Sequence, residues 1–184
     1  MNVIVYGSKV FGQIVRQLVL DAGHQFIGFI DDFNQGPDVL GTWEDVVGRY
    51  PPGEFDVVMG IGTNDLPARA AACGRVQQAG FGIPRLVRQS AIVDPRSELS
   101  EGDIVMAGVV VGMFARVAAN SVLWTGSVIC HDSRVGSNTF VGPNATVCGF
   151  ATVGRNCFLG AGSVVVNHCH VPDGTFVRAG AVYK

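Results

Sequence analysis

The sequence predicts an α/β domain over residues 1–90, followed by an all-β domain, a parallel β-helix, over residues 91–184. Short apolar segments alternate with helix-like segments in the first half, and a strict hydrophobic period of six residues runs through the second half. The chain also has 25 glycines in 184 residues, about twice the usual share, as a fold with many tight turns requires.

Charge and cysteine content narrow the class of protein. Charged residues make up only 15% of the chain and the net charge is −2, so we expect neither a nucleic-acid partner nor a membrane surface. No apolar run approaches the roughly 18 residues of a membrane span. The five cysteines include no C-x-x-C pair, which indicates reduced thiols in a cytoplasmic protein and no metal site.

The first domain is expected to be Rossmann-like. Apolar segments predict strands at residues 3–7, 26–30, 55–62 and 85–87, and helical spacing predicts helices at residues 10–20 and 68–79. Residues 63–65 offer an N-cap for the second helix, and Pro67 suits its first turn. Strands that alternate with helices in this way indicate a small parallel sheet with right-handed crossovers.

The turns after these strands hold the candidate binding residues of the first domain, because ligands of parallel α/β sheets bind beyond the carboxyl ends of the strands. These residues are Gly7, Ser8, Lys9, Gly12, Asp31, Asp32, Gly62 and Asn64.

The turn that begins at Gly7 is an incomplete dinucleotide-binding fingerprint. Lys9 stands where the middle glycine of the fingerprint belongs, whereas Gly12 keeps the last one. Asp31 lies 24 residues after Gly7, close to the spacing of a ribose-binding acid. Ordinary βα turns explain these residues equally well. Lys9 is therefore either a phosphate partner or a surface charge, and Asp31 and Asp32 either bind a ligand or begin the next turn.

The second half repeats every six residues from Val93 to Tyr183. Fifteen of the sixteen residues in this series are Val, Leu or Ile. The residue four positions later is small at every repeat except Asp103, and the residue three positions later is mostly Gly, Asn or Asp. Period six is incompatible with an α-helix, and β-branched valine favours strands.

The aliphatic, small and Gly/Asn/Asp positions of the repeat, which form three columns when the repeats are aligned, have one physical explanation. The aliphatic residue and the small residue two positions before it point to the same side of a short strand, into a narrow interior. The Gly, Asn or Asp residue lies at a corner, where a positive φ is needed. Each hexapeptide is then one flat face and one corner, and the faces stack as a parallel β-helix.

The second half resembles the hexapeptide-repeat acyltransferases. The segments 31–33, 61–64 and 125–132, together with the domain that precedes the repeat, resemble the sugar acetyltransferases of the PglD/NeuD type. The resemblance implies a left-handed β-helix of about five coils, with 18 residues in each coil, and a homotrimer with active sites between subunits. It implies acetyl-CoA as the acyl donor and a nucleotide-linked sugar as the acceptor.

The resemblance also assigns catalytic roles. His131 matches the general base of the family, and Asp132 matches the acid that orients it. Gly149 matches the glycine whose N–H stabilises the thioester oxyanion. From the residues alone, an exposed corner histidine, a corner aspartate and a corner glycine have purely structural explanations.

Further residues are candidates for the binding of acetyl-CoA and of the acceptor. Gly160 and Gly162 match the region that binds CoA in the family. Arg178, near the C-terminal coil, is either a partner of the CoA phosphates or a surface charge. Two positions depart from the family, because Phe140 replaces a histidine and Trp124 replaces an asparagine. We assign Phe140 to acetyl-CoA binding and Trp124 to acceptor binding. Either the acceptor pocket is more apolar here, or both rings fill a trimer interface.

The expected function is acetyl transfer from acetyl-CoA to the amino group of a nucleotide-linked amino sugar, with His131 as the base. Two alternatives stay open. One is O-acetylation of a sugar such as sialic acid. The other is a hexapeptide protein that binds a nucleotide sugar without catalysis, because Trp124 and Phe140 have replaced polar groups.

Overall fold

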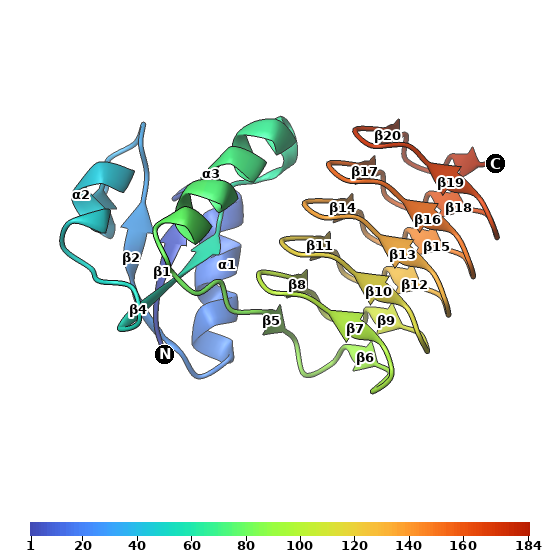
Figure 1. The fold of residues 1–184 in the computed structure, drawn as a ribbon, viewed down its shortest axis with the longest axis horizontal. Helices are drawn as coiled ribbons and strands as arrows, with labels where there is room; N and C mark the ends of the chain where they lie inside the picture. Colours follow the sequence, from blue (N-terminus) through green and yellow to red (C-terminus); the bar gives the residue numbers. More distant parts are fainter. The chain divides into compact units, whose positions relative to one another are not determined.

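The computed structural model describes residues 1–184, which divide into two compact units, Met1–Leu86 and Val87–Lys184 (Figure 1). The sequence placed the domain boundary slightly later, between residues 90 and 91. No helix in either unit has the length and apolar character needed to cross a bilayer.

The first unit is a four-stranded parallel sheet with helices, and its strand order is β3-β2-β1-β4. Its elements are β1 (Asn2–Tyr6), α1 (Val10–Asp21), β2 (Gln25–Ile30), β3 (Val39–Gly41), α2 (Trp43–Val47), β4 (Phe55–Met59), the 3-10 helix η1 (Thr63–Asp65) and α3 (Leu66–Gln78). The order reverses between β1 and β4, so the switch point at which such sheets bind ligands lies at the ends of these two strands.

The sequence analysis missed β3 and α2 and assigned the fourth strand wrongly. It expected residues 85–87 in the first sheet, but β5 (Leu86–Val87) joins a sheet of the second unit, and β3 supplies the fourth strand. Val87 stands six residues before Val93, so the hexapeptide series already includes it. The start of α2 also had a signal, a capping box formed by Thr42 and Asp45.

The second unit is a parallel β-solenoid with three flat faces, as predicted, and its coils stack along one direction in Figure 1. Face 1 consists of β5, β8 (Ile104–Val105), β11 (Val122–Leu123), β14 (Phe140–Val141), β17 (Phe158–Leu159) and β20 (Phe176–Val177). Face 2 consists of β6 (Ile92–Val93), β9 (Val110–Val111), β12 (Val128–Ile129), β15 (Thr146–Val147), β18 (Val164–Val165) and β21 (Val182–Tyr183). Face 3 consists of β7 (Glu98–Leu99), β10 (Arg116–Val117), β13 (Arg134–Val135), β16 (Thr152–Val153) and β19 (His170–Val171).

The interior of the solenoid is filled by the two predicted columns. The aliphatic residues of the period are almost all buried, and small residues such as Ala115, Ser133 and Ala145 are buried with them. Asp103 is the exception in the small column, yet it too is fully buried. Its carboxylate accepts hydrogen bonds from the backbone N–H groups of Ser100, at 2.8 Å, and Ser121, at 3.0 Å, which offset the loss of water.

Three edges separate the faces, and we name each after one of its residues. The Gly162 edge joins face 1 to face 2, the His131 edge joins face 2 to face 3, and the Asn138 edge joins face 3 to face 1. Strands one coil apart pair in register at 18-residue spacing, as Val128 does with Thr146. Residues 18 positions apart therefore lie directly above one another along each edge.

Candidate active site

His131 and Asp132 form the turn of the His131 edge, between β12 and β13. Asp132 has a φ of 56°, and this left-handed turn directs both side chains away from the interior. The His131 side chain is 54% exposed, and its Nδ1 lies 3.1 Å from Oδ2 of Asp132. This contact favours the tautomer with a proton on Nδ1 and leaves Nε2 free to accept a proton. The structure thus brings these two predicted residues together.

Gly149 lies one coil above His131, and the imidazole packs against its backbone. A Cβ atom on Gly149 would lie 2.8 Å from Cε1 and 2.9 Å from Nε2 of His131. Only glycine leaves room for the ring at this position. The Gly149 N–H donates no hydrogen bond within the chain, so the predicted oxyanion donor is available next to the imidazole.

The turn residues of the His131 edge differ from those of the other two edges. Positive φ values at the Gly162 and Asn138 edges occur only at glycine or asparagine, which tolerate them best: Gly102, Gly108, Asn120, Gly126, Asn138, Asn144, Asn156, Gly162, Gly174 and Gly180. The same positions of the His131 edge hold Phe114, Asp132, Phe150 and His168. A bulky residue in this conformation costs about 1–2 kcal/mol, and such strain concentrates at functional sites.

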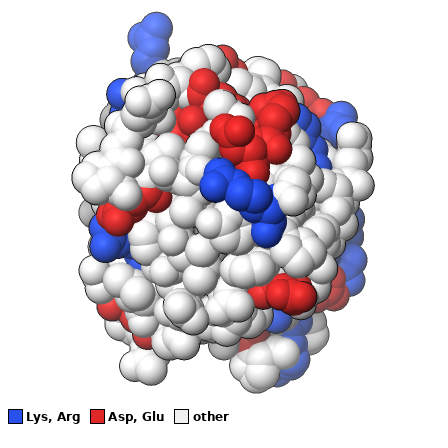
Figure 2. All heavy atoms as spheres, turned by 90° about the vertical axis from the view of Figure 1, so that its left-hand side faces the viewer, with Lys and Arg blue, Asp and Glu red and all other residues white.

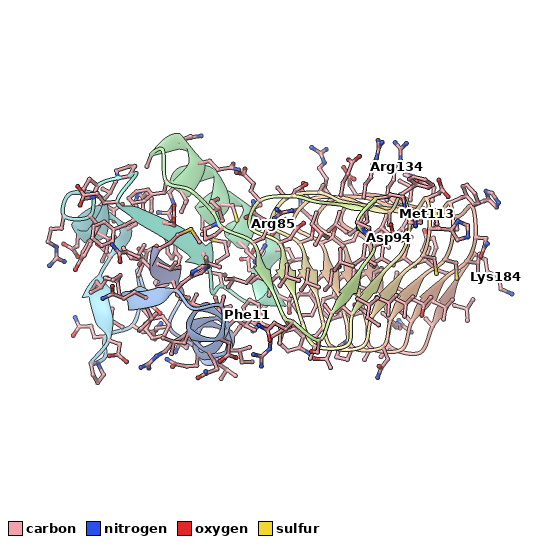
Figure 3. All side chains as sticks on the ribbon, turned by 90° about the horizontal axis from the view of Figure 1, so that it is seen from below. Phe11, Arg85, Asp94, Met113, Arg134 and Lys184 are labelled. Carbon is pink, nitrogen blue, oxygen red and sulfur yellow. The ribbon has the colours of Figure 1, made fainter.

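The His131 edge also exposes apolar side chains. Phe114 is 51% exposed and Phe150 is 48% exposed, and Met113 precedes Phe114 in the same turn. Figure 3 marks this part of the solenoid by Asp94, Met113 and Arg134, and the Arg134 side chain extends away from the coils. Turn positions that hold glycine or asparagine at the other two edges therefore carry exposed aromatic rings at this one.

Trp124 and Phe140 belong to face 1 rather than to the His131 edge. Phe140 is the outward residue of β14, and its ring centroid lies 5.6 Å from that of Trp124, just after β11. The two aromatic side chains that replace polar residues of the family therefore contact each other. Phe158 stacks on Phe140 at 5.5 Å and Phe176 on Phe158 at 5.0 Å, so an aromatic ladder runs up this face.

The residues carried over for CoA lie near this ladder and away from His131. Gly160 and Gly162 flank the turn after β17, and Arg178 follows β20, so all three lie at the Gly162 edge. Gly160 packs closely on the coil above, because an added Cβ would lie 2.4 Å from the Ala179 nitrogen. The width of face 2 separates these residues from the imidazole of the same chain.

In the first unit, Gly7 and Gly12 act as the first and last glycines of the dinucleotide-binding fingerprint: the first permits a tight turn, and the last permits close packing of the helix. Gly7 has a φ of 109°, and a Cβ there would lie 2.9 Å from backbone atoms of Gly60 and Ile61. Gly12 lets α1 approach the same turn, because its Cβ would overlap the Gly7 carbonyl. The sequence analysis did not single out Gly60, whose Cβ would lie 2.9 Å from the Gly12 Cα.

Asp31 joins the turn after β1 to the turn after β2. Its Oδ2 accepts hydrogen bonds from the backbone N–H and hydroxyl of Ser8, and its Oδ1 accepts from Phe33 and Asn34. Burial opposes ionisation of Asp31, but these hydrogen bonds outweigh it and lower the pKa of the carboxyl to about 2. Both oxygens are thus engaged within the chain, and the role that the structure shows for Asp31 is to hold these turns.

Asp32 lies in a second cluster, which the sequence analysis did not foresee. Its carboxylate accepts hydrogen bonds from the Tyr6 hydroxyl, at 2.6 Å, and the Trp43 N–H, at 2.8 Å, and it forms an ion pair with Arg75 at 3.3 Å. Burial raises the pKa of Tyr6, and the hydrogen bond to Asp32 raises it further. The rings of Tyr6 and Trp43 stack at 5.8 Å. Sequence spacing carried no signal for this cluster.

Lys9 and Asn64 are exposed at the β1 and β4 ends of the sheet, where Lys9 is the N-cap residue of α1 and Gly62 precedes η1. Figure 2 shows acidic and basic side chains interspersed on this unit, with wide uncharged areas between them. Phosphate binding here would depend on local N–H groups and Lys9 rather than on a broad positive surface.

Comparison with known proteins shows what this chain is similar to. Residues 2–71 match the PglD N-terminal domain. The acetyltransferase domain of PglB from Neisseria gonorrhoeae superposes with a TM-score of 0.91 at 25% identity, over 100% of this chain and 91% of that chain. Perosamine N-acetyltransferase from Caulobacter crescentus, solved as a mutant with CoA and GDP-perosamine, gives 0.93 at 25% identity, over 100% and 89%.

Together with the parallel β-solenoid, these similarities fit a hexapeptide-repeat acyltransferase of the PglD/NeuD type. WeeI from Acinetobacter baumannii shares the fold, with a TM-score of 0.77 at 16% identity, over 99% of this chain and 96% of that chain. A comparison with curated proteins found no significant match. In this acyltransferase, sequence reasoning missed Gly60 and the contacts of Phe150. It also missed the cluster of Tyr6, Asp32, Trp43 and Arg75, which we call the Tyr6 cluster.

Proposed function

We propose that this acyltransferase transfers the acetyl group of acetyl-CoA to the amino group of a nucleotide-linked amino sugar, with His131 as the general base. The observation that carries the proposal is the His131 edge. An exposed imidazole is held through Nδ1 by Asp132, and an unengaged N–H of Gly149 lies one coil above it. Perosamine N-acetyltransferase, which has the same fold, binds CoA and GDP-perosamine.

The chemistry requires one proton acceptor and one oxyanion donor. The acceptor nitrogen attacks the thioester carbonyl carbon and forms a C–N bond, while Nε2 of His131 takes a proton from that nitrogen. The Gly149 N–H stabilises the carbonyl oxygen as it becomes negative, and Asp132 stabilises the imidazolium. The C–S bond then breaks, and the imidazolium returns its proton to the CoA sulfur.

The location of the other candidate residues supports a homotrimer. Gly160, Gly162 and Arg178 lie at the Gly162 edge with Trp124 and Phe140 close by, whereas His131, Asp132 and Gly149 lie at the His131 edge. One chain therefore carries two half-sites on separate edges. A neighbouring solenoid that placed its Gly162 edge against the His131 edge would complete the site, and threefold symmetry would repeat this contact at every interface.

We assign nucleotide binding to the turn at Gly7 and to its neighbours after β2 and β4. Ser8, which Asp31 holds in place, and Lys9 directly precede α1, where backbone N–H groups attract phosphate. Gly62 and Asn64 follow β4 across the switch point of the sheet. All five cysteines are free thiols, which supports a reducing compartment, the cytoplasm.

The decisive experiment is acetyl transfer measured by mass spectrometry of the sugar product. The protein would be incubated with acetyl-CoA and a panel of UDP-, GDP- and dTDP-linked 4-amino sugars. The expected result is an acetylated product from one member of the panel, absent when His131 is replaced by alanine. Absence of product across the panel would contradict the proposal.

The aromatic contact between Trp124 and Phe140 favours an extension of the same panel. An apolar wall in place of two polar side chains suits a different acceptor or a larger acyl group. Free sialic acids and longer acyl-CoA donors are therefore included. A product from sialic acid alone would replace the N-acetyltransferase proposal with O-acetylation, and binding of a nucleotide sugar without transfer would indicate a non-catalytic protein.

A further inference from the structure

Phe150 occupies an unfavourable backbone position next to the proposed base. Its φ is 60°, and the corresponding turn position of the Gly162 edge, six residues earlier, is Asn144 with a φ of 55°. Asparagine or glycine would relieve the strain in the turn, because neither has the same steric penalty in the left-handed region. An exposed aromatic ring that is kept against a backbone penalty points to a function of the ring.

The ring of Phe150 is in contact with the imidazole of His131. Their centroids are 5.2 Å apart and their planes meet at 85°, which is the edge-to-face arrangement that aromatic pairs prefer. The backbone strengthens this contact, because the Phe150 N–H donates to the His131 carbonyl at 3.3 Å. On its other side, the Phe150 ring stacks in parallel on the His168 ring, with the two centroids 4.9 Å apart. His168 thus limits the movement of Phe150 away from His131.

His131 needs such a support because its other restraints are few. The side chain is 54% exposed, and its only polar contact is with Asp132, a neighbouring residue that is itself 39% exposed. A hydrogen bond between two exposed side chains in water is a weak restraint. Gly149 gives the imidazole space but, lacking a side chain, does not hold its orientation.

We propose that Phe150 is a positioning residue, which holds the His131 imidazole in the orientation that presents Nε2 to the acceptor and is itself held by His168. This inference rests on the proposed function of His131. The strained turn is then the consequence of placing an aromatic ring where a small turn residue would fold more easily.

Phe114 provides a matched control on the same edge. It has a φ of 61°, an exposure of 51% and the same place in its turn, but its ring contact is with the Arg96 guanidinium at 5.8 Å rather than with His131. Replacement of Phe114 or Phe150 by asparagine relieves the same backbone strain, and only the change at Phe150 removes the contact with the imidazole.

The test compares Phe150→Asn, Phe114→Asn and Phe150→Tyr with the unmodified protein. Both asparagine variants should have an unchanged melting temperature or one higher by about 2–4 °C. Phe150→Asn should lower kcat between about tenfold and 10²-fold with little change in KM for acetyl-CoA. Phe114→Asn and Phe150→Tyr should keep kcat within about twofold of the unmodified value, since transition-state geometry is retained. Equal kcat values for the two asparagine variants would overturn the inference.

A second measurement does not depend on turnover. The ring of Phe150 should shift the NMR signals of the His131 ring protons, and this shift should disappear in Phe150→Asn and persist in Phe114→Asn. An unchanged His131 signal in Phe150→Asn would contradict the positioning role. Lack of transfer by the unmodified protein, with the ring shift present, would instead contradict the proposed function and leave the contact established.

Discussion

Asp31 and His131 show how differently the two units use a polar side chain. In the first unit, the Asp31 carboxylate is almost buried and both of its oxygens accept hydrogen bonds from the chain. In the solenoid, the His131 side chain is 54% exposed and has one polar partner, Asp132. The first unit thus uses this carboxylate to hold two turns together, whereas the solenoid exposes an imidazole that has a single polar partner.

Removal of His131 is the strongest test of this difference. His131→Ala should reduce kcat by about 10²- to 10⁴-fold, because it removes the proposed general base. The melting temperature should hardly change, because the side chain is exposed. Steady-state kinetics and thermal unfolding measure the two effects. His170→Ala, at another exposed histidine of the solenoid, is the control and should retain activity; an equal loss in both variants would refute a specific role.

A methyl group at Gly149 should disturb the same site by a steric clash with the His131 ring. Gly149→Ala should lower kcat by about 10- to 100-fold, because the new Cβ would lie 2.8 Å from the imidazole and displace it. Gly174→Ala provides the control, since Gly174 has a φ of 71° but no atom within 4 Å of an added Cβ. That control should lose stability without losing kcat. A fully active Gly149→Ala enzyme would show that the ring need not lie over this glycine.

Replacement of Asp31 should affect stability and its pH dependence. The pKa of Asp31 is lowered from 3.8 to about 2 in the folded protein, so its ionised form stabilises the fold by about 2 kcal/mol above pH ~4. This contribution is lost as the pH falls from about 4 to about 2. Thermal unfolding of Asp31→Asn should show a lower melting temperature at pH 7 and a smaller difference near pH 2. A difference independent of pH would contradict this account of the carboxylate.

The smallest effect is expected at the N-terminus of α2. Thr42→Ala removes the side-chain oxygen that accepts the Asp45 N–H, and it should destabilise the first unit by about 1 kcal/mol. Circular dichroism during thermal unfolding would measure the change, and Thr42→Ser, which keeps the hydroxyl, should behave like the unmodified protein. A loss of kcat in Thr42→Ala would show that activity depends on this end of α2, where the Trp43 N–H donates to Asp32.

The solenoid could be predicted from sequence because its period repeats the same physical demand in every coil. Val111, Ile129 and Val147 are buried for the same reason, and the series places His131 at an edge. Counting in steps of 18 also predicts that Gly149 lies above His131. The same arithmetic would have placed Val87 in the first coil, so the assignment of residues 85–87 to the first sheet was avoidable.

The remaining features depend on contacts between residues with no fixed spacing. The hydrogen bonds of Asp31 with Ser8 and Asn34 depend on two turns that meet in space. The Tyr6 cluster brings together residues of β1, α2 and α3 and the turn after β2. The edge-to-face contact of Phe150 with His131 depends on rotamers. The sequence shows that Phe150 is an exception among the Gly, Asn and Asp residues of its column. It does not show which ring Phe150 contacts.

The register of 18 residues between coils restricts how this enzyme can evolve in length. An insertion of one hexapeptide between His131 and Gly149 would move every later residue to the next face and separate His131 from Gly149. An insertion of a whole coil elsewhere would preserve all three edges. Lineages of this fold should therefore lengthen or shorten by complete coils, and the segment from His131 to Gly149 should keep a constant length.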